Sequence, residues 1–114
     1  MATTSVKGTR ALSFYSATKA AVRSFARNWT LDLKDRKIRV NAVSPGVVPT
    51  PGYKLTGLTD EQIQGFADMQ VANIPMRRVG TTDEIARAVV FLACDDSSFV
   101  NGIELFVDGG MPQI

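Results

Sequence analysis

The sequence predicts an α/β fold in which two short parallel strands are joined by helical segments. Three observations support it: an amphipathic pattern over residues 14–36, two β-like segments at 38–43 and 102–107, and the order helix, strand, long loop, helix, strand. Strand–helix–strand units of this kind place their strands parallel. A stable parallel sheet needs several strands and cover on both faces. We therefore expect residues 1–114 to form one partial domain, which is incomplete without further strands.

The first helix is predicted from apolar residues at every fourth position, namely Ala17, Ala21, Phe25, Trp29 and Leu33. A separate basic stripe contains Lys19, Arg23 and Arg27. Basic residues at 34–37 are expected to form the last helical turn, where positive charge suits the helix dipole. The strand at 38–43 follows and is expected to stop at Ser44-Pro45-Gly46.

The middle of the chain, residues 49–80, is expected to be a lid-like loop that carries a small helix. Four of the five prolines lie between positions 45 and 80. Thr59 followed by Gln62 has the form of a capping box, which predicts a short helix, although Gly65 weakens it. Long loops of this kind are more often lids than simple connections.

A second capping box, Thr81 with Glu84, opens a helix with one broad apolar face. The segment Asp95-Asp96-Ser97-Ser98 is expected to break this helix. The last strand, 102–107, then ends at Asp108-Gly109-Gly110, which is a strong turn signal.

Composition excludes several classes of protein. The net charge of +2 comes from 13 basic residues spread along the chain, so a nucleic-acid binder is not expected. No apolar stretch approaches the roughly 20 residues of a membrane span, and the first residues do not resemble a secretory signal. One cysteine and no histidine exclude a disulfide framework, a zinc site and a histidine-based triad. We expect a cytoplasmic protein without a metal site.

Tyr15 and Lys19 are the candidates for acid–base chemistry. Residues four apart share one face of a helix, so the phenol and the ammonium are expected to point the same way. A nearby cation favours phenolate and is expected to lower the pKa of Tyr15 from about 10. Such a tyrosine could exchange a proton with an alcohol or carbonyl oxygen. The same spacing alone is also typical of a solvated helix face.

Further motifs accompany this pair in a fixed order: Asn41-x-x-x-Pro45-Gly46, Val48, Thr50, Gly102 and Val107-Asp108-Gly109-Gly110. Together they resemble the carboxyl-terminal half of the short-chain dehydrogenase/reductase family, over nearly the whole chain. The resemblance implies a Rossmann-type doubly wound parallel sheet. It also implies an NAD- or NADP-dependent oxidoreductase that interconverts a secondary alcohol and a carbonyl by hydride transfer.

The resemblance also implies roles for individual residues. Tyr15 is the catalytic acid/base, and Lys19 contacts the nicotinamide ribose and lowers the pKa of the tyrosine. The turn Pro45-Gly46 passes beside the nicotinamide, with Val48 and Thr50 holding its carboxamide. Residues 49–80 correspond to the substrate lid.

The sequence departs from the family pattern in what it lacks. It has no glycine-rich turn for the pyrophosphate and no residue that selects between NAD and NADP. The family's catalytic Asn is also absent. Its catalytic Ser aligns with Ala2, and Ser5 could replace it only in a shifted register. The chain alone is therefore expected to bind no dinucleotide.

Three functional hypotheses remain open. The chain is part of an oxidoreductase and inactive alone, or a half-enzyme completed by assembly with itself or with a separate amino-terminal half, or a non-catalytic self-associating module. All three predict a homo-oligomer, a dimer or larger, because the family packs this helix and the last strand between subunits.

Overall fold

A computed structural model describes residues 10–111 of the chain and has the predicted α/β architecture. The elements in order are α1 (Ser13–Asp32), β1 (Ala42–Pro45), α2 (Asp60–Val71), α3 (Thr82–Ala93) and β2 (Glu104–Val107). Short 3-10 turns lie at Lys34–Arg36, Pro51–Thr56 and Asp95–Ser97. β1 and β2 are parallel neighbours, with Ala42 opposite Glu104 and Pro45 opposite Val107.

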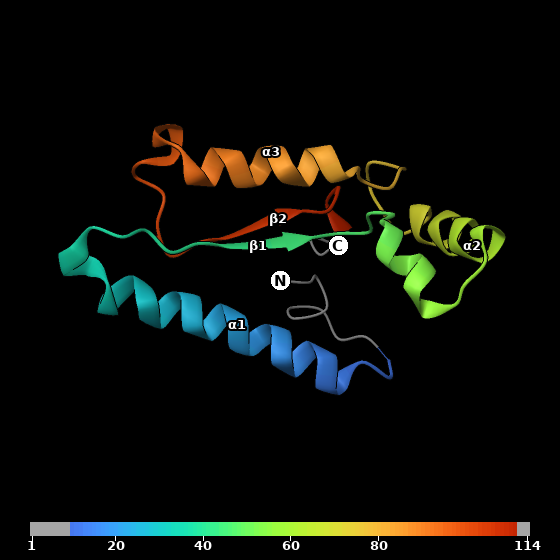
Figure 1. The fold of residues 1–114 in the computed structure, drawn as a ribbon, viewed down its shortest axis with the longest axis horizontal. Helices are drawn as coiled ribbons and strands as arrows, with labels where there is room; N and C mark the ends of the chain where they lie inside the picture. Colours follow the sequence, from blue (N-terminus) through green and yellow to red (C-terminus); the bar gives the residue numbers. More distant parts are fainter. Residues whose placement is uncertain (1–9, 112–114) are drawn as a thin grey trace.

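The two strands lie between α1 on one face and α3 on the other (Figure 1). Both helices run opposite to the strands, so the amino ends of α1 and α3 lie at the end of the sheet where β1 and β2 finish (Figure 1). α2 lies beyond this same end. Ligands of open α/β sheets bind outside the carboxyl ends of the strands, which makes this end the place to look for a site.

The first helix is confirmed, but it ends earlier than predicted. α1 stops at Asp32, and Lys34–Arg36 form a separate 3-10 turn in which the Arg36 amide donates to the Leu33 carbonyl at 3.0 Å. Lys37 then takes a left-handed conformation with φ of 56°. The prediction that these basic residues form the last turn of the helix was therefore wrong.

The strands are shorter than predicted, and β1 starts four residues later. Strand 38–43 becomes Ala42–Pro45, and 102–107 becomes Glu104–Val107. Before the strands begin, two asparagine side chains join the segments beside a backbone bond from the Gly102 amide to the Val40 carbonyl at 2.9 Å. Asn41 donates to the Val100 carbonyl at 3.0 Å and accepts from the amide of Ile103, while Asn101 accepts from the amide of Val40 at 2.8 Å. These bonds keep the two segments side by side ahead of β1 and β2.

Both predicted capping boxes are confirmed. At Thr59 and at Thr81 the hydroxyl accepts from the amide three residues later, and the side chain of that residue accepts from the amide of the threonine. Each capping box gives hydrogen-bond partners to two backbone amides that would otherwise be unpaired at the start of the helix. Of the helices described, none has both the length and the apolarity to cross a membrane.

Few apolar residues among those described are buried; these are Ala26, Ala42, Ala67 and Ile74. The chain exposes 7914 Å² of surface, whereas a compact monomer of this mass exposes about 6,100 Å². Its radius of gyration is 15.6 Å, compared with about 13 Å for a compact domain of this length. The fold is therefore open, with apolar surface that its own elements do not cover.

Candidate functional site

The amino end of α1 brings Tyr15 and Lys19 together as predicted. The ammonium nitrogen of Lys19 lies 5.3 Å from the centre of the Tyr15 ring. Tyr15 is 46% exposed, so its phenol is accessible. The first turn of α1 carries no acidic residue and no side-chain cap, which leaves the positive end of the helix dipole uncompensated beside the pair. The phenol and ammonium are thus two adjacent donors suited to an oxygen that accepts hydrogen bonds.

Gly46 follows β1 directly and packs against the end of β2. Its amide donates to the Val107 carbonyl at 3.0 Å, which extends the strand pairing by one bond. A Cβ atom at this position would lie 2.6 Å from the Cα of Asp108. The structure therefore gives Gly46 a packing reason to be glycine. Its predicted approach to a nicotinamide, like that of Pro45, stays a prediction.

Val48 and Thr50 lie on the segment that leaves this strand end. The Val48 side chain packs against Gly80, where an added Cβ would lie 3.1 Å from it, and the Gly80 amide donates to the Val47 carbonyl at 2.9 Å. Thr50 is exposed, and its carbonyl accepts from the amide of Tyr53 at 3.1 Å. The segment is thus held at Val47 and Val48 by contacts with Gly80, whereas Thr50 is exposed to solvent.

These predicted residues lie at the same end of the sheet, since the amino end of α1 and the carboxyl end of β1 coincide there (Figure 1). Within residues 10–111, no hydrogen bond joins the Tyr15–Lys19 pair to residues 45–50. Ser5, the candidate replacement for the family serine, lies outside the described residues. The end of the sheet therefore carries two groups of candidate residues without a direct link between them.

A cavity of about 500 Å³ lies at this same end of the sheet, between the start of α3 and the end of β2. At its edge Arg78 donates twice to Glu84, at 2.9 and 2.6 Å. These bonds, with one from the Thr81 amide, lower the pKa of Glu84 to about 2. Because the two charges satisfy each other, the pair has a structural rather than a ligand-binding geometry. Three of the lining residues, Met76, Arg78 and Gly80, belong to the predicted lid-like segment 49–80, and Val47 lies between Gly46 and Val48. The other lining residues are Glu84, Ile85, Phe106, Val107, Asp108, Gly109 and Gly110.

One polar cluster was missed by the sequence reasoning. Arg23 of α1 lies on the sheet, with its Nε 3.3 Å from Oε2 of Glu104, and Ser44 donates to the other oxygen of Glu104 at 2.6 Å. Two features of the sequence could have pointed to this cluster. Glu104 is the only acidic residue in the apolar segment 102–107, and Arg23 follows Lys19 by one helical turn.

The chain matches known proteins over almost its full length. Residues 1–112 match a family model described as enoyl-(acyl carrier protein) reductase. A 3-oxoacyl-(acyl-carrier-protein) reductase from Thermotoga maritima is 37% identical over 97 residues, or 85% of this chain. A glucose 1-dehydrogenase from Gluconobacter oxydans is 43% identical over 98 residues, again 85% of this chain.

Solved structures show the same similarity. A structure described as a short chain dehydrogenase/reductase family protein superposes with a TM-score of 0.81 and 40% identity over 97% of this chain. The match covers 43% of that protein, 37% of the Thermotoga reductase and 35% of the Gluconobacter dehydrogenase. The chain thus spans about two fifths of the length of the proteins it matches.

Proposed function

Because the chain belongs to the short-chain dehydrogenase/reductase family, we propose that it carries the acid–base part of an oxidoreductase that interconverts a secondary alcohol and a carbonyl. The observation that carries the proposal is the Tyr15–Lys19 pair, with its 5.3 Å separation of ammonium and ring, at the carboxyl end of two parallel strands. The relatives are named as reductases and dehydrogenases, which agrees with this reaction class.

The coenzyme proposed is NAD or NADP, and the residues present fit its nicotinamide end. The phenol of Tyr15 and the ammonium of Lys19 can donate to ribose and substrate oxygens, and the exposed hydroxyl of Thr50 can contact a carboxamide. No glycine-rich turn for a pyrophosphate occurs in the 114 residues. A protein limited to these residues would therefore need a second polypeptide to hold the whole coenzyme.

In the proposed mechanism Tyr15 moves the proton. Its hydroxyl donates to the carbonyl oxygen of the substrate during reduction and accepts the proton back during alcohol oxidation. When bound, the nicotinamide supplies or accepts the hydride. The half-exposed position of Tyr15 lets its proton exchange with solvent after each turnover.

Lys19 has two proposed tasks in this mechanism. Its ammonium lies 5.3 Å from the centre of the Tyr15 ring, and it is proposed to stabilise the charge that develops on the substrate oxygen. It also donates to the ribose and so helps to orient it. Backbone groups at Pro45-Gly46 and Val48 are proposed to border the carboxamide, with residues 49–80 closing over the substrate.

The test supplies the missing part in trans. The chain is mixed with an amino-terminal segment of a family member that carries a glycine-rich turn, and the mixture is titrated with NADH and NADPH by coenzyme fluorescence. We expect saturable binding by the mixture and none by either part alone. Tight binding by the 114-residue chain alone would favour the half-enzyme completed by self-assembly. No binding by any mixture, including one with a covalent linker, would contradict the proposal.

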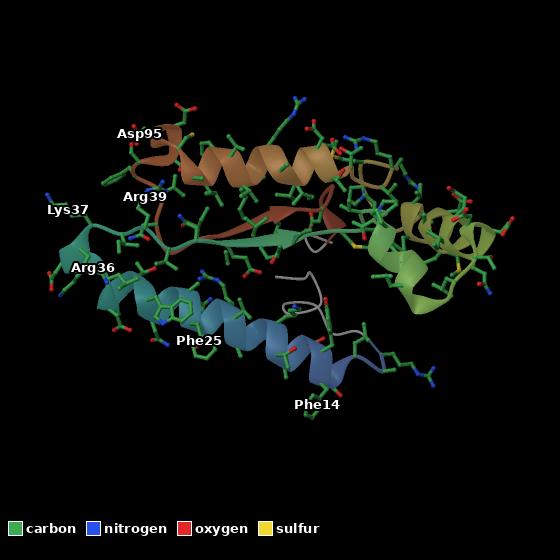
Figure 2. The ribbon with its side chains drawn as sticks, in the orientation of Figure 1. Phe14, Phe25, Arg36, Lys37, Arg39 and Asp95 are labelled. Atoms are coloured by element: carbon green, nitrogen blue, oxygen red, sulfur yellow. The ribbon has the colours of Figure 1, made fainter. Side chains whose placement is uncertain are left out.

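A second candidate function is self-association without catalysis, and exposed apolar residues on α1 favour it. Phe14 is 87% exposed, and Phe25 and Trp29 are each about half exposed and stacked on one another with ring centres 5.5 Å apart. In Figure 2, Phe14 and Phe25 point away from the sheet. We propose that this face of α1 packs between copies in a homodimer or larger assembly. The cytoplasm is the proposed location for either function.

Sedimentation velocity at micromolar concentration tests this second candidate. The unmodified chain is expected to sediment as a dimer or larger species, whereas Phe25→Glu is expected to shift it toward monomer. Arg27→Glu, an exposed change on the same helix, is the matched control for added negative charge. A monodisperse monomer of the unmodified chain would contradict self-association.

A further inference from the structure

A buried polar cluster connects the helix that carries Tyr15 and Lys19 to both strands. Arg23 of α1 approaches Oε2 of Glu104 at 3.3 Å and donates from Nη2 to the carbonyl of Gly102 at 2.9 Å. Ser44 of β1 donates to Oε1 of Glu104 at 2.6 Å. Glu104 opens β2, so one carboxylate joins all three elements. We call Arg23, Glu104 and Ser44 the polar clamp.

The side chains of the clamp are largely buried, so the free energy of the fold depends on how they are placed. The side chains of Arg23 and Glu104 are 15% and 9% exposed, and Ser44 is fully buried. Charges removed from water must be paired and hydrogen-bonded, and removing only one partner of such a pair is strongly destabilising. The Glu104 carboxylate and the Gly102 carbonyl together therefore limit where the guanidinium can lie.

Few other contacts fix the position of α1 over the sheet. Ala26 is the only buried residue described on this helix. Its methyl group is small, so it can pack on the sheet at several positions of the helix along its axis. The other directional bond from α1 to this strand region comes from Thr30, whose hydroxyl lies 3.4 Å from the Val40 carbonyl and 2.9 Å from its own helix at Ala26. The charged contacts of α1 come from Arg23, whose Nη2 donates to the Gly102 carbonyl at 2.9 Å and whose Nε lies 3.3 Å from Oε2 of Glu104.

We propose that the polar clamp sets the position of α1 along the sheet, with Arg23 as a positioning residue. Lys19 and Tyr15 lie one and two turns before Arg23 on the same face, so sliding the helix moves all three together. A shift of one residue along the helix axis is about 1.5 Å, and errors of about 1 Å can cost 100-fold in rate. The catalytic consequence rests on the proposed function, whereas the position of the helix does not.

The test distinguishes a change in the position of α1 from a change in the stability of the whole chain. Arg23→Met/Glu104→Met replaces the pair with apolar side chains of similar length, a change that often keeps or raises stability. Trp29, the only tryptophan, is the energy donor, and the acceptor dye is attached to Phe99→Cys in a Cys94→Ser background because Phe99 is fully exposed. Time-resolved energy transfer then reports the distance distribution between α1 and the far side of the sheet.

The double variant is expected to unfold at a urea concentration close to that of the unmodified chain, yet to show a broader or shifted distance distribution. Arg27→Met, an exposed change on the same helix, is expected to leave the distribution unchanged. Glu104→Gln keeps the shape and removes only the charge, and it is expected to broaden the distribution as well. It provides the test if the double variant does not fold.

The same distance distribution in every folded variant would overturn the proposal, because the clamp would then add stability without setting position. In the mixture with a glycine-rich segment, the dissociation constant of NADH is expected to rise severalfold in the double variant. If the unmodified mixture binds no NADH, the proposed function fails, while the energy-transfer result still decides the role of the clamp.

Discussion

Replacing Arg39 is expected to cause a large loss of stability without touching the candidate site. Its guanidinium donates to three carbonyls, those of Leu92 at 2.9 Å, Val100 at 3.1 Å and Cys94 at 3.3 Å. Two of these carbonyls lie at the carboxyl end of α3, where positive charge also suits the helix dipole. Figure 2 shows Arg39 next to this end of the helix, near Asp95. Arg39 therefore joins the approach to β1 with α3 and the approach to β2.

The size of the loss follows from these bonds. A hydrogen bond to a charged group contributes about 1.5–3 kcal/mol, but the three share one side chain and the freed carbonyls partly regain water. We expect Arg39→Met to lower the free energy of unfolding by about 2–4 kcal/mol, which is roughly a 30- to 700-fold rise in the unfolding equilibrium constant. Urea unfolding followed by circular dichroism measures it.

Arg36→Met is the matched control, because Arg36 is exposed and lies three residues away in the same chain segment. It is expected to change the free energy of unfolding by no more than about 0.5 kcal/mol. Equal urea midpoints for Arg39→Met and Arg36→Met would refute the reasoning, since the three carbonyl contacts would then contribute nothing.

Three further predictions concern other parts of the chain. Gly46→Ala is expected to lower stability by about 1–3 kcal/mol, measured by thermal unfolding, because its Cβ would lie 2.6 Å from the Cα of Asp108; an unchanged melting temperature would contradict this. The pKa of Glu84, about 2 in the fold against an ordinary 4.5, means that its contribution is present above pH 4.5 and is lost as the pH falls toward 2. Glu84→Gln should therefore lose less stability than the unmodified chain between pH 5 and pH 2, and parallel losses would contradict the role of Arg78. Phe25→Ser is expected to weaken self-association at least tenfold in sedimentation equilibrium, with no change if α1 is not the contact face.

Local signals in the sequence predicted the helices well. The capping boxes at Thr59 and Thr81 fixed the starts of α2 and α3 because the motif satisfies specific backbone amides without help from distant residues. The spacing of Tyr15 and Lys19 also placed them side by side, since helical geometry alone determines it.

Features that depend on partners distant in the chain were not predictable in this way. The segment that leads into β1 is held by Asn41 and Asn101, whose side chains bond across about 60 residues of sequence. The pair Arg23 and Glu104 spans about 80 residues, so the acidic residue in the apolar segment 102–107 can be noticed in the sequence, whereas its partner cannot be identified there. The packing of Gly46 on Asp108 likewise appears only when both strand ends are in place.

The most direct test of the central claim is the effect of Tyr15→Phe on turnover in the chain assembled with a glycine-rich amino-terminal segment. The variant removes one oxygen, so NADH affinity is expected to stay within about twofold while kcat falls by about 100- to 10,000-fold, the usual contribution of a general acid or base. Arg27→Met, an exposed change on the same helix, is the control and should retain its activity. Unchanged kcat in Tyr15→Phe would contradict the assignment of Tyr15 as the proton donor.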